Sequence, residues 1–322
     1  LRVFLFNDLQ TGDPVAWREL SITVPYEYVE PISYLFGRYG KGVSTEPAGS
    51  GQVLLRTYLA SGSKQRMARI EVGVRLVGAI EPIGDLAVRE LPENEDWMNS
   101  WKSHFRILRI GKRLVIKPTW LELDEDIGPE NIVVELDPGV AFGTGYHPTT
   151  NTCMQAMEEH ITPGMAVLDL GTGSGILAIT AMRLGAGNVT ALDIDAQAVS
   201  AARRNFKRTG INKQVRLGQG SVPHPTAPAG EFDLAVANIS ARGVADRCPF
   251  ILTALKPGGL FIASGLLATQ KPEVANAVEP LGFSLVSKWP QEEWVTLLYK
   301  APDLQSPYQN NRVVTTPRSS SA

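Results

Sequence analysis

The sequence predicts an α/β fold in which a doubly wound, mostly parallel sheet ends in an antiparallel hairpin and follows a small α+β domain. Strand-like and helix-like stretches alternate from residue 164 onward, which is typical of a parallel sheet covered on both faces. An apolar run at 165–170 leads straight into a turn with three glycines in five positions. The last two predicted strands, 284–289 and 293–300, are too close together for a crossover helix and therefore form an antiparallel hairpin.

The composition of the chain limits the classes of function. The 322 residues are 43% hydrophobic and carry a formal net charge of −2, so bulk nucleic-acid binding through a strongly basic surface is not expected. The two cysteines, Cys153 and Cys248, lie far apart without metal-ligand spacing, which suits a reducing compartment. No apolar stretch is long enough to span a membrane. We therefore expect a cytoplasmic protein with no metal site and no membrane partner.

The N-terminal part of the chain is predicted to contain one small domain. Residues 1–16 show no clear pattern and are interpreted as an extension. Residues 17–92 follow the order β-α-β-β-α-β of a ferredoxin-like domain, and the aromatic-rich segment 93–105 is expected to be a helical linker. The predicted strands are 17–24, 40–46, 52–59 and 86–91, and the predicted helices are 25–39 and 63–77.

Residues 106–300 are predicted to form the larger domain, and 301–322 a disordered tail rich in Ser, Pro, Asn, Gln and Thr. The first strand of this domain is expected within 111–120, where Pro118 ends it. The later strands are expected at 165–170, 188–194, 215–219, 232–239, 259–265, 284–289 and 293–300, with helices at 175–185, 196–209, 242–255 and 271–281.

Gly171, Gly173 and Gly175 turn the chain sharply between a predicted strand and a predicted helix. Glycine lets the backbone approach a ligand closely, and the N–H groups of the following helix point toward that ligand. Asp193 ends the next predicted strand about twenty residues later, where a carboxylate can accept hydrogen bonds from both hydroxyls of a ribose. The neighbouring Asp195 is a second candidate, although it can instead cap the helix that follows. The alternative for the whole motif is a tight turn without a ligand.

Two cofactors fit this turn and carboxylate, NAD and S-adenosylmethionine (AdoMet). The glycines follow the pattern Gly-x-Gly-x-Gly rather than the Gly-x-Gly-x-x-Gly of dinucleotide sites, which favours a ligand without a pyrophosphate. A sheet that closes with an antiparallel hairpin is typical of AdoMet-dependent methyltransferases, whereas a Rossmann dehydrogenase normally continues as β-α-β. The sequence therefore predicts AdoMet and a Rossmann-like methyltransferase sheet, with NAD as the alternative.

Asn238 ends the predicted strand 232–239, at the edge where open α/β sheets bind their ligands. Its amide is well placed to hold a cofactor or a substrate amine. The alternative is a turn residue that caps the helix predicted at 242–255.

The segment 136–150 contains two prolines and three glycines and therefore predicts a shaped loop rather than a strand. It can fold over a bound cofactor, with Phe142 against the cofactor and hydroxyls such as that of Thr144 reaching it. Thr149 or Thr150 can cap the helix that follows. The alternative is a simple interdomain loop.

His147, in the same loop, is a candidate general base, with a structural role as the alternative. The sequence contains no Ser-His-Asp set and no metal-ligand cluster, so it does not support a hydrolase or a metalloenzyme.

Five segments, in this order, resemble the PrmA-type ribosomal protein methyltransferases: LDPGVAFGTGYHPTT, VLDLGTGSGILAI, ALDIDAQAV, VANISA and LKPGGLFIASGLL. The predicted linker EDWMNSWKSHF and the strand segment GKRLVIKPTW are similar to that family too. The resemblance extends over roughly 17–300, and the loop, the glycine turn and the Asn238 strand end together make it specific.

The resemblance implies AdoMet as the methyl donor and protein amines, both lysine side chains and the N-terminal amine, as acceptors. The substrate it implies is the stalk-base protein of the large ribosomal subunit, recognised by the small N-terminal domain. We expect Asn238 to be catalytic and to orient the amine through its side-chain oxygen. The implied cofactor contacts fall on Thr150, Gly171, Asp193 and Asn238, and the turn and loop add Gly173, Phe142 and Thr144.

Two positions depart from the usual pattern of the family, Tyr146 in the loop and Ser240 after the strand end. Both are expected to face the acceptor. Two other classes of function therefore stay open. One is a methyltransferase of similar fold that acts on another protein or a small molecule, and the other is an AdoMet-binding module without catalytic activity.

Overall fold

The computed structural model describes residues 17–49, 51–79, 82–91, 106–136, 145 and 147–303. The chain divides into two compact units, residues 1–105 and 106–322, each of which is considered by itself. The predicted extension 1–16 and linker 93–105 lie outside the described residues, as does most of the predicted tail. In the parts of the chain that the structure describes, no helix is both long and apolar enough to cross a bilayer.

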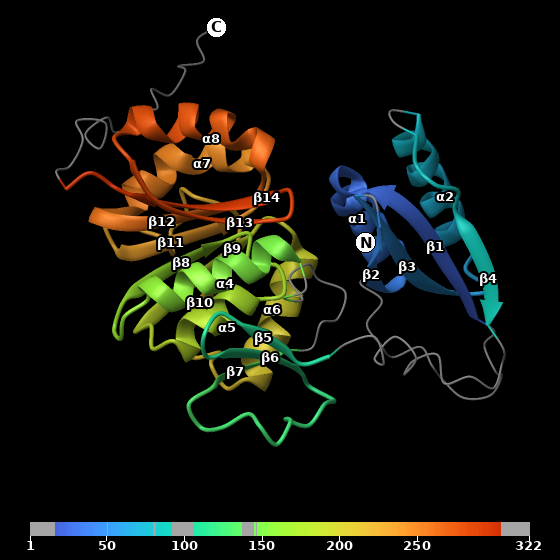
Figure 1. The fold of residues 1–322 in the computed structure, drawn as a ribbon, viewed down its shortest axis with the longest axis horizontal. Helices are drawn as coiled ribbons and strands as arrows, with labels where there is room; N and C mark the ends of the chain where they lie inside the picture. The colour runs from blue at the N-terminus through green and yellow to red at the C-terminus, as the bar shows by residue number, and fades with distance from the viewer. Residues whose placement is uncertain are drawn as a thin grey trace, which may run out of the picture. The chain divides into compact units, whose positions relative to one another are not determined.

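The first unit is a four-stranded antiparallel sheet with two helices (Figure 1). Its strand order, β2-β3-β1-β4, and the element order along the chain are those of the predicted ferredoxin-like arrangement. The elements are β1 (Trp17–Pro25), α1 (Val29–Tyr39), β2 (Lys41–Gly49), β3 (Gln52–Ala60), α2 (Lys64–Gly78) and β4 (Ala87–Leu91).

Alternation along β1 explains how this sheet buries one face. Leu20, Ile22 and Val24 are buried on the side of the helices, and the residues between them are half-buried. They pack with Phe36 of α1 and Ile70 of α2 in one apolar core. The first helix begins four residues later than predicted, because a short 3₁₀ turn follows the proline that ends β1.

The second unit is built on a seven-stranded sheet of order β10-β9-β8-β11-β12-β14-β13. The first five strands in this order are parallel, and β14 is antiparallel to both of its neighbours, which confirms the predicted terminal hairpin. The last strand of the hairpin is the inner one. The strands are β8 (Ala166–Leu170), β9 (Asn188–Asp193), β10 (Val215–Gln219), β11 (Phe232–Asn238), β12 (Leu255–Leu267), β13 (Ser284–Gln291) and β14 (Trp294–Lys300).

Helices cover both faces of this sheet (Figure 1). Neighbouring residues of β8 enter different cores, Val167 on one face and Leu168 on the other, which explains why the strand is apolar without alternation. One face carries α4 (Pro148–His160), α5 (Ile176–Arg183) and α6 (Ala196–Arg208), and the other carries α7 (Ala241–Ala254) and α8 (Lys271–Val278).

A separate three-stranded sheet packs into the core on the α4 and α5 side through side chains such as Ile116 and Val134. It consists of β5 (Leu108–Ile110), β6 (Leu114–Pro118) and β7 (Ile132–Leu136). Only β6 was expected, within a longer strand. The strand starts later than expected because Gly111, at φ 57°, makes a turn between β5 and β6.

Two residues that follow β14 form backbone hydrogen bonds to the segment before β12's central part. The amide of Ala301 donates to the carbonyl of Gly259 (2.8 Å), and that of Gly258 donates to the carbonyl of Pro302 (3.0 Å). These bonds therefore hold the first two residues, Ala301 and Pro302, of the segment that was expected to be a disordered tail.

Glu158, near the end of α4, clamps the β5–β6 turn to the helix. Its carboxylate accepts from the amides of Lys112 (2.7 Å) and Arg113 (2.8 Å), and its side chain is only 5% exposed. A Cβ on Gly111 would collide with this carboxylate, so the turn and the acid fit each other closely. The clamp fixes the far end of the helix whose first turn enters the functional site.

We expect Glu158→Ala to lower the free energy of unfolding by roughly 1–3 kcal/mol, because two backbone donors lose their acceptor. The measurement is urea unfolding at neutral pH. The matched control is Glu159→Ala, because Glu159 is the exposed neighbour on the same helix. Equal stabilities of the two variants would show that the clamp contributes nothing.

Candidate active site

The residues predicted to act together meet at one edge of the seven-stranded sheet. The glycine turn follows β8, Asp193 ends β9 and Asn238 ends β11. These parallel strands end at the same edge, and β8 is the point from which the chain builds the sheet first to one side and then to the other. Such a switch point is where open α/β sheets bind ligands.

The glycine turn requires its glycines. Gly171, Gly173 and Gly175 have φ values of 76°, 56° and 87°, which side chains with a Cβ rarely adopt. A Cβ on Gly171 would also collide with Ile239, and one on Gly175 would lie 2.5 Å from the ring of Phe206. The turn is therefore held tightly between Ile239, just after β11, and Phe206 of α6.

Asp193 closes the turn onto β9. Its carboxylate accepts from the amide of Gly173 (2.9 Å) and from the amide of Asp195 (2.9 Å). Partial burial raises its pKa, and the two amides act against that rise. Asp195 itself accepts from the amide of Gln197 (2.9 Å) and caps α6, so the capping alternative for Asp195 is correct.

Asp169, the last but one residue of β8, was not singled out from the sequence. It is completely buried, and one carboxylate oxygen accepts from the hydroxyl of Thr172 (2.6 Å) and the amide of Ala178 (3.1 Å). The other oxygen, Oδ1, is buried without a partner. Burial raises its pKa to about 7, and the charge of Asp193 acts in the same direction. The available signal was an acid inside a strand that is apolar on both faces.

Asn238 is oriented by Thr150. Its amide nitrogen donates to the hydroxyl of Thr150 (3.2 Å), which is completely buried, and its oxygen Oδ1 is buried without a partner. The alternative that Asn238 caps the next helix is wrong, because Ser240 is the cap of α7 and accepts from the amide of Gly243 (3.2 Å). The departure from the family pattern at Ser240 therefore has a structural explanation.

His147 begins α4, and neither Thr149 nor Thr150 is the cap that was expected. The ring nitrogen Nδ1 accepts from the amide of Thr149 (3.3 Å), and Pro148 takes the first helical position. The ring packs edge-on against Trp294, with ring centroids 4.8 Å apart. Burial lowers its pKa to about 4. The geometry thus supports the structural alternative for His147, because so weak a base would remove few protons at neutral pH.

A chain of buried hydroxyls fixes the first turns of α4 on the sheet. The hydroxyl of Thr296 in β14 lies 2.7 Å from that of Thr152 and 2.6 Å from that of Ser264. Ser264 also donates to the carbonyl of Thr149 (3.4 Å). These contacts hold Thr150 in place against Asn238.

Phe142 and Thr144 lie outside the described residues, so their contact with a cofactor stays a prediction. Gly145, at the end of the same loop, is buried with φ 85°, and a Cβ there would collide with Ile116 of β6. This end of the loop is therefore seated on the three-stranded sheet.

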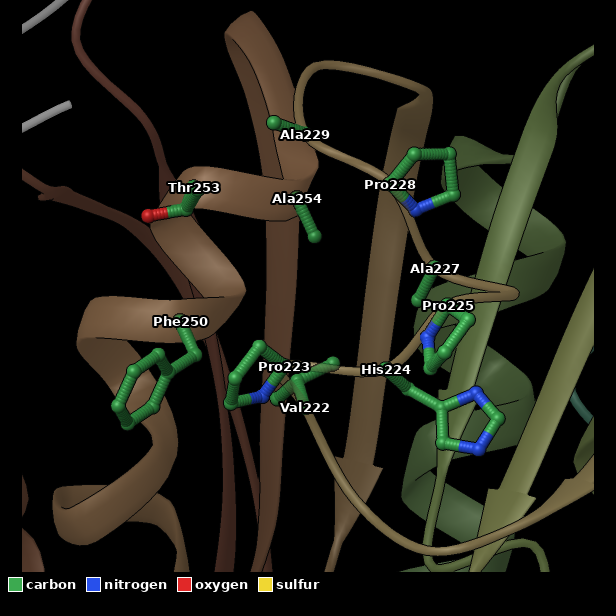
Figure 2. Close-up of a pocket in the computed structure, with 10 residues that line it drawn as sticks. All are labelled: Val222, Pro223, His224, Pro225, Ala227, Pro228, Ala229, Phe250, Thr253 and Ala254. Atoms are coloured by element: carbon green, nitrogen blue, oxygen red, sulfur yellow. The ribbon is translucent and has the colours of Figure 1, made fainter. Parts of the chain in front are cut away.

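A pocket of about 370 Å³ lies elsewhere, between the loop after β10 and the end of α7 (Figure 2). Phe250 and Thr253 of α7 line one side, and Pro223 and His224 come from the loop. None of the residues predicted to bind the cofactor or the substrate lines it. Among the described residues no group of His, Cys, Asp and Glu is arranged to hold a metal.

The glycine turn, the carboxylates and Asn238 fit AdoMet. The glycine turn lies beside the carboxylate of Asp193, which is suited to a ribose, and Asp169 and Asn238 each present a buried oxygen without a partner. Acceptor oxygens of this kind suit a ligand that carries an ammonium group and a sulfonium charge. The sheet order with its inserted antiparallel β14 and this donor site define a class I AdoMet-dependent methyltransferase.

Comparison with known proteins then gives the family. The family model described as ribosomal protein L11 methyltransferase (PrmA) matches residues 16–302, and the chain belongs to this family. The resemblance noted in the sequence is thereby confirmed, as is AdoMet rather than NAD as the cofactor.

Individual relatives agree over most of the chain. The ribosomal protein L11 methyltransferase of Chloroflexus aurantiacus is 39% identical over 89% of this chain and 98% of its own length. That of Symbiobacterium thermophilum is 42% identical over 76% of this chain and 78% of its own. The crystal structure of a ribosomal protein L11 methylase from Lactobacillus delbrueckii subsp. bulgaricus is 32% identical, with a TM-score of 0.57, and covers 62% of this chain and 100% of that one.

The raised pKa of Asp169 predicts a pH-dependent stability. Its pKa is about 7 in the fold, against an ordinary value of 3.8. Between these pH values the folded state holds a proton on Asp169 that the unfolded state has lost, so the associated stability falls as the pH rises from about 4 to about 7. The variant Asp169→Asn cannot ionise at this position. Without a bound donor, its free energy of unfolding should therefore rise relative to that of the wild type by up to about 4 kcal/mol between pH 4 and pH 7.

The measurement is the difference between the unfolding free energies of the two proteins at each pH. A difference is needed because His147 also makes the stability depend on pH. Its pKa is lowered to about 4, so it lowers the free energy of unfolding as the pH falls below 6.5, whereas Asp169 raises it. His147 is the same in both proteins, and its contribution cancels. A difference that does not change with pH would contradict the buried, protonated carboxyl.

Proposed function

We propose that this protein transfers methyl groups from AdoMet to amines of ribosomal protein L11, the stalk-base protein of the large ribosomal subunit. The family match and the names of the relatives support the substrate. The observation that carries the chemistry is the unpartnered oxygen of Asn238, held in place by Thr150 at the edge of the donor site. The acceptors are lysine side chains and the N-terminal amine.

On the donor side, the proposed cofactor contacts are the backbone of the turn at Gly171 and Gly173 and the carboxylate of Asp193, which accepts hydrogen bonds from the ribose hydroxyls. Asp169 Oδ1 is the acceptor for the ammonium group, and Thr150 lines the same side. Phe142 and Thr144, in the loop before α4, are proposed to cover the bound cofactor. When bound, AdoMet supplies a methyl group activated by a sulfonium, and the protein's task is to align the acceptor with it.

On the acceptor side, the nucleophile must be a neutral amine. A free lysine has a pKa of about 10.4, and deprotonating it at pH 7 costs roughly 4–5 kcal/mol. Burial and a neighbouring positive charge both favour the neutral form, so no dedicated base is required. Asn238 Oδ1 accepts a hydrogen bond from the amine N–H. This bond orients the lone pair of the amine nitrogen toward the methyl group. An amide oxygen removes no proton, and therefore the role of Asn238 is orientation.

The small N-terminal domain is proposed to recognise the ribosomal protein. The boundaries 17–92 for this domain, 93–105 for the linker and 106–300 for the methyltransferase domain are part of the proposal. The net charge of −2 supports a partner other than bulk nucleic acid. The two cysteines are free and buried, which fits work in the reducing cytoplasm.

The direct test is mass spectrometry of purified ribosomal protein L11 after incubation with the enzyme and AdoMet. We expect mass increments of whole methyl groups, which peptide mapping assigns to lysines or the N-terminus. A parallel titration with S-adenosylhomocysteine measures donor-site binding without the acceptor. Unmodified L11 in the presence of an enzyme that binds S-adenosylhomocysteine would point to a different acceptor or to a module that binds without catalysing.

Asn238→Ala should lower kcat for L11 methylation by on the order of 10²-fold, because one preorganised hydrogen-bond partner of the reacting group is lost. Its affinity for S-adenosylhomocysteine should change far less. The control is Arg242→Ala on the first turn of α7, whose exposed side chain pairs only with Asp246 in the described structure. Full turnover of Asn238→Ala with normal donor binding would refute the orienting role.

A further inference from the structure

The helix α2 is apolar on two opposite sides. One side buries Ile70 and Val74 against the four-stranded sheet. Val72 and Leu76, 57% and 65% exposed, lie on the other side. With exposed Ala68 they are spaced four residues apart and form one line along the helix, here called the α2 stripe. Packing of a helix on a sheet requires only one apolar face, so the described residues of this unit do not account for the stripe.

The stripe is flanked by positive charge. At 100° per residue, Lys64 and Arg75 lie along one side of it and Arg69 along the other, and all three are exposed. Within the residues that the structure describes, no carboxylate forms an ion pair with Lys64 or Arg75. Glu71 is the one acid in the helix.

The neighbouring helix α1 extends this positive surface. Arg69 stacks over the ring of Tyr39 at 5.5 Å, and Arg38 stacks over the same ring at 5.8 Å. Arg38 also donates to the hydroxyl of Tyr34 (2.6 Å), whose side chain is more than half exposed. The two helices thus present arginines and aromatic rings beside the apolar line, the residue types that are enriched in protein interfaces.

We propose that the α2 stripe is the docking surface for the protein substrate, and that it receives an amphipathic helix whose apolar face is bordered by acidic side chains. The inference rests on the proposed function and adds the surface and the chemistry of its partner. A line of residues spaced by four is the ridge that packs into the groove of another helix. The basic side chains on both flanks favour a partner that has acidic side chains beside its apolar face, and they determine the orientation in which it binds.

The apolar line argues for a protein rather than an RNA. Binding to a nucleic-acid backbone depends on cations and hydrogen-bond donors, to which Val72 and Leu76 would contribute nothing. A protein interface instead takes its energy from apolar side chains at its centre and uses charges at its rim. The stripe has this arrangement, with the apolar residues central and the charges outside.

The test uses the full-length enzyme, purified L11 and two variants. Val72→Gln combined with Leu76→Gln removes the apolar line and keeps residues that favour an exposed helix. We expect the KM and the Kd for L11 to rise about ten-fold or more, as for the loss of interface hot spots. The kcat at saturating L11 and the affinity for S-adenosylhomocysteine should stay as in the wild type.

The second variant, Lys64→Glu combined with Arg75→Glu, reverses one flank. It should weaken L11 binding most at low salt, because screening reduces the contribution of exposed charges. The matched control is Val286→Gln on β13, a position that is similarly exposed in the other unit.

The outcomes separate the two proposals. Wild-type KM and Kd in the double glutamine variant would overturn the docking surface and leave the proposed methylation intact. Binding of L11 that depends on the stripe, without any methylation by the wild type, would overturn the proposed function and support the surface. Binding of a structured RNA that is lost in the Lys64 and Arg75 variant, with L11 binding unchanged in both variants, would assign the surface to RNA and overturn the proposal.

Discussion

The hydrogen bond from the amide of Gly173 to the carboxylate of Asp193 joins the two strand ends on which the donor site is built. It links the turn after β8 to the end of β9, and the amides of Gly171 and Thr172 strengthen the link by donating to the carbonyl of Leu192. The turn also lies against Ile239, just after β11, so the ends of β8, β9 and β11 are fixed relative to one another. Gly171 and Gly175 have no room for a Cβ and have positive φ values, so the turn depends on glycine at these two positions.

Patterns local in the chain were predictable from the sequence. The glycine turn, Asp193 and the terminal hairpin each depend on residues close together, and their periodicity or spacing is sufficient. The strands β5 and β7 were missed because short strands, only three residues long in β5, carry little periodicity. The pairing of Asn238 with Thr150 joins residues 88 positions apart, and only the folded chain brings them together. The capping role of His147 was missed because histidine is not among the usual caps.

Helix α4 positions Thr150, which orients Asn238 and is proposed to contact the cofactor. Its first turn presents Thr150 to Asn238, and a chain of buried hydroxyls anchors that turn to β12 and β14. Its other end is tied to the β5–β6 turn by Glu158. Buried polar groups of this kind are stabilising only when all are satisfied, so they specify one position of the helix. The buried oxygens of Asp169 and Asn238 that have no partner are not part of this anchor.

The inner position of β14 has a consequence for how the enzyme is made. Although β14 is the last strand in the described part of the chain, it lies between β12 and β13, and Leu297, Leu298 and Tyr299 are fully buried. A nascent chain that lacks it leaves an open sheet edge and an unfilled core. The residues proposed to hold the donor and the acceptor are all synthesised before Lys300. The sheet that carries the proposed site is therefore completed only after β14 has been synthesised.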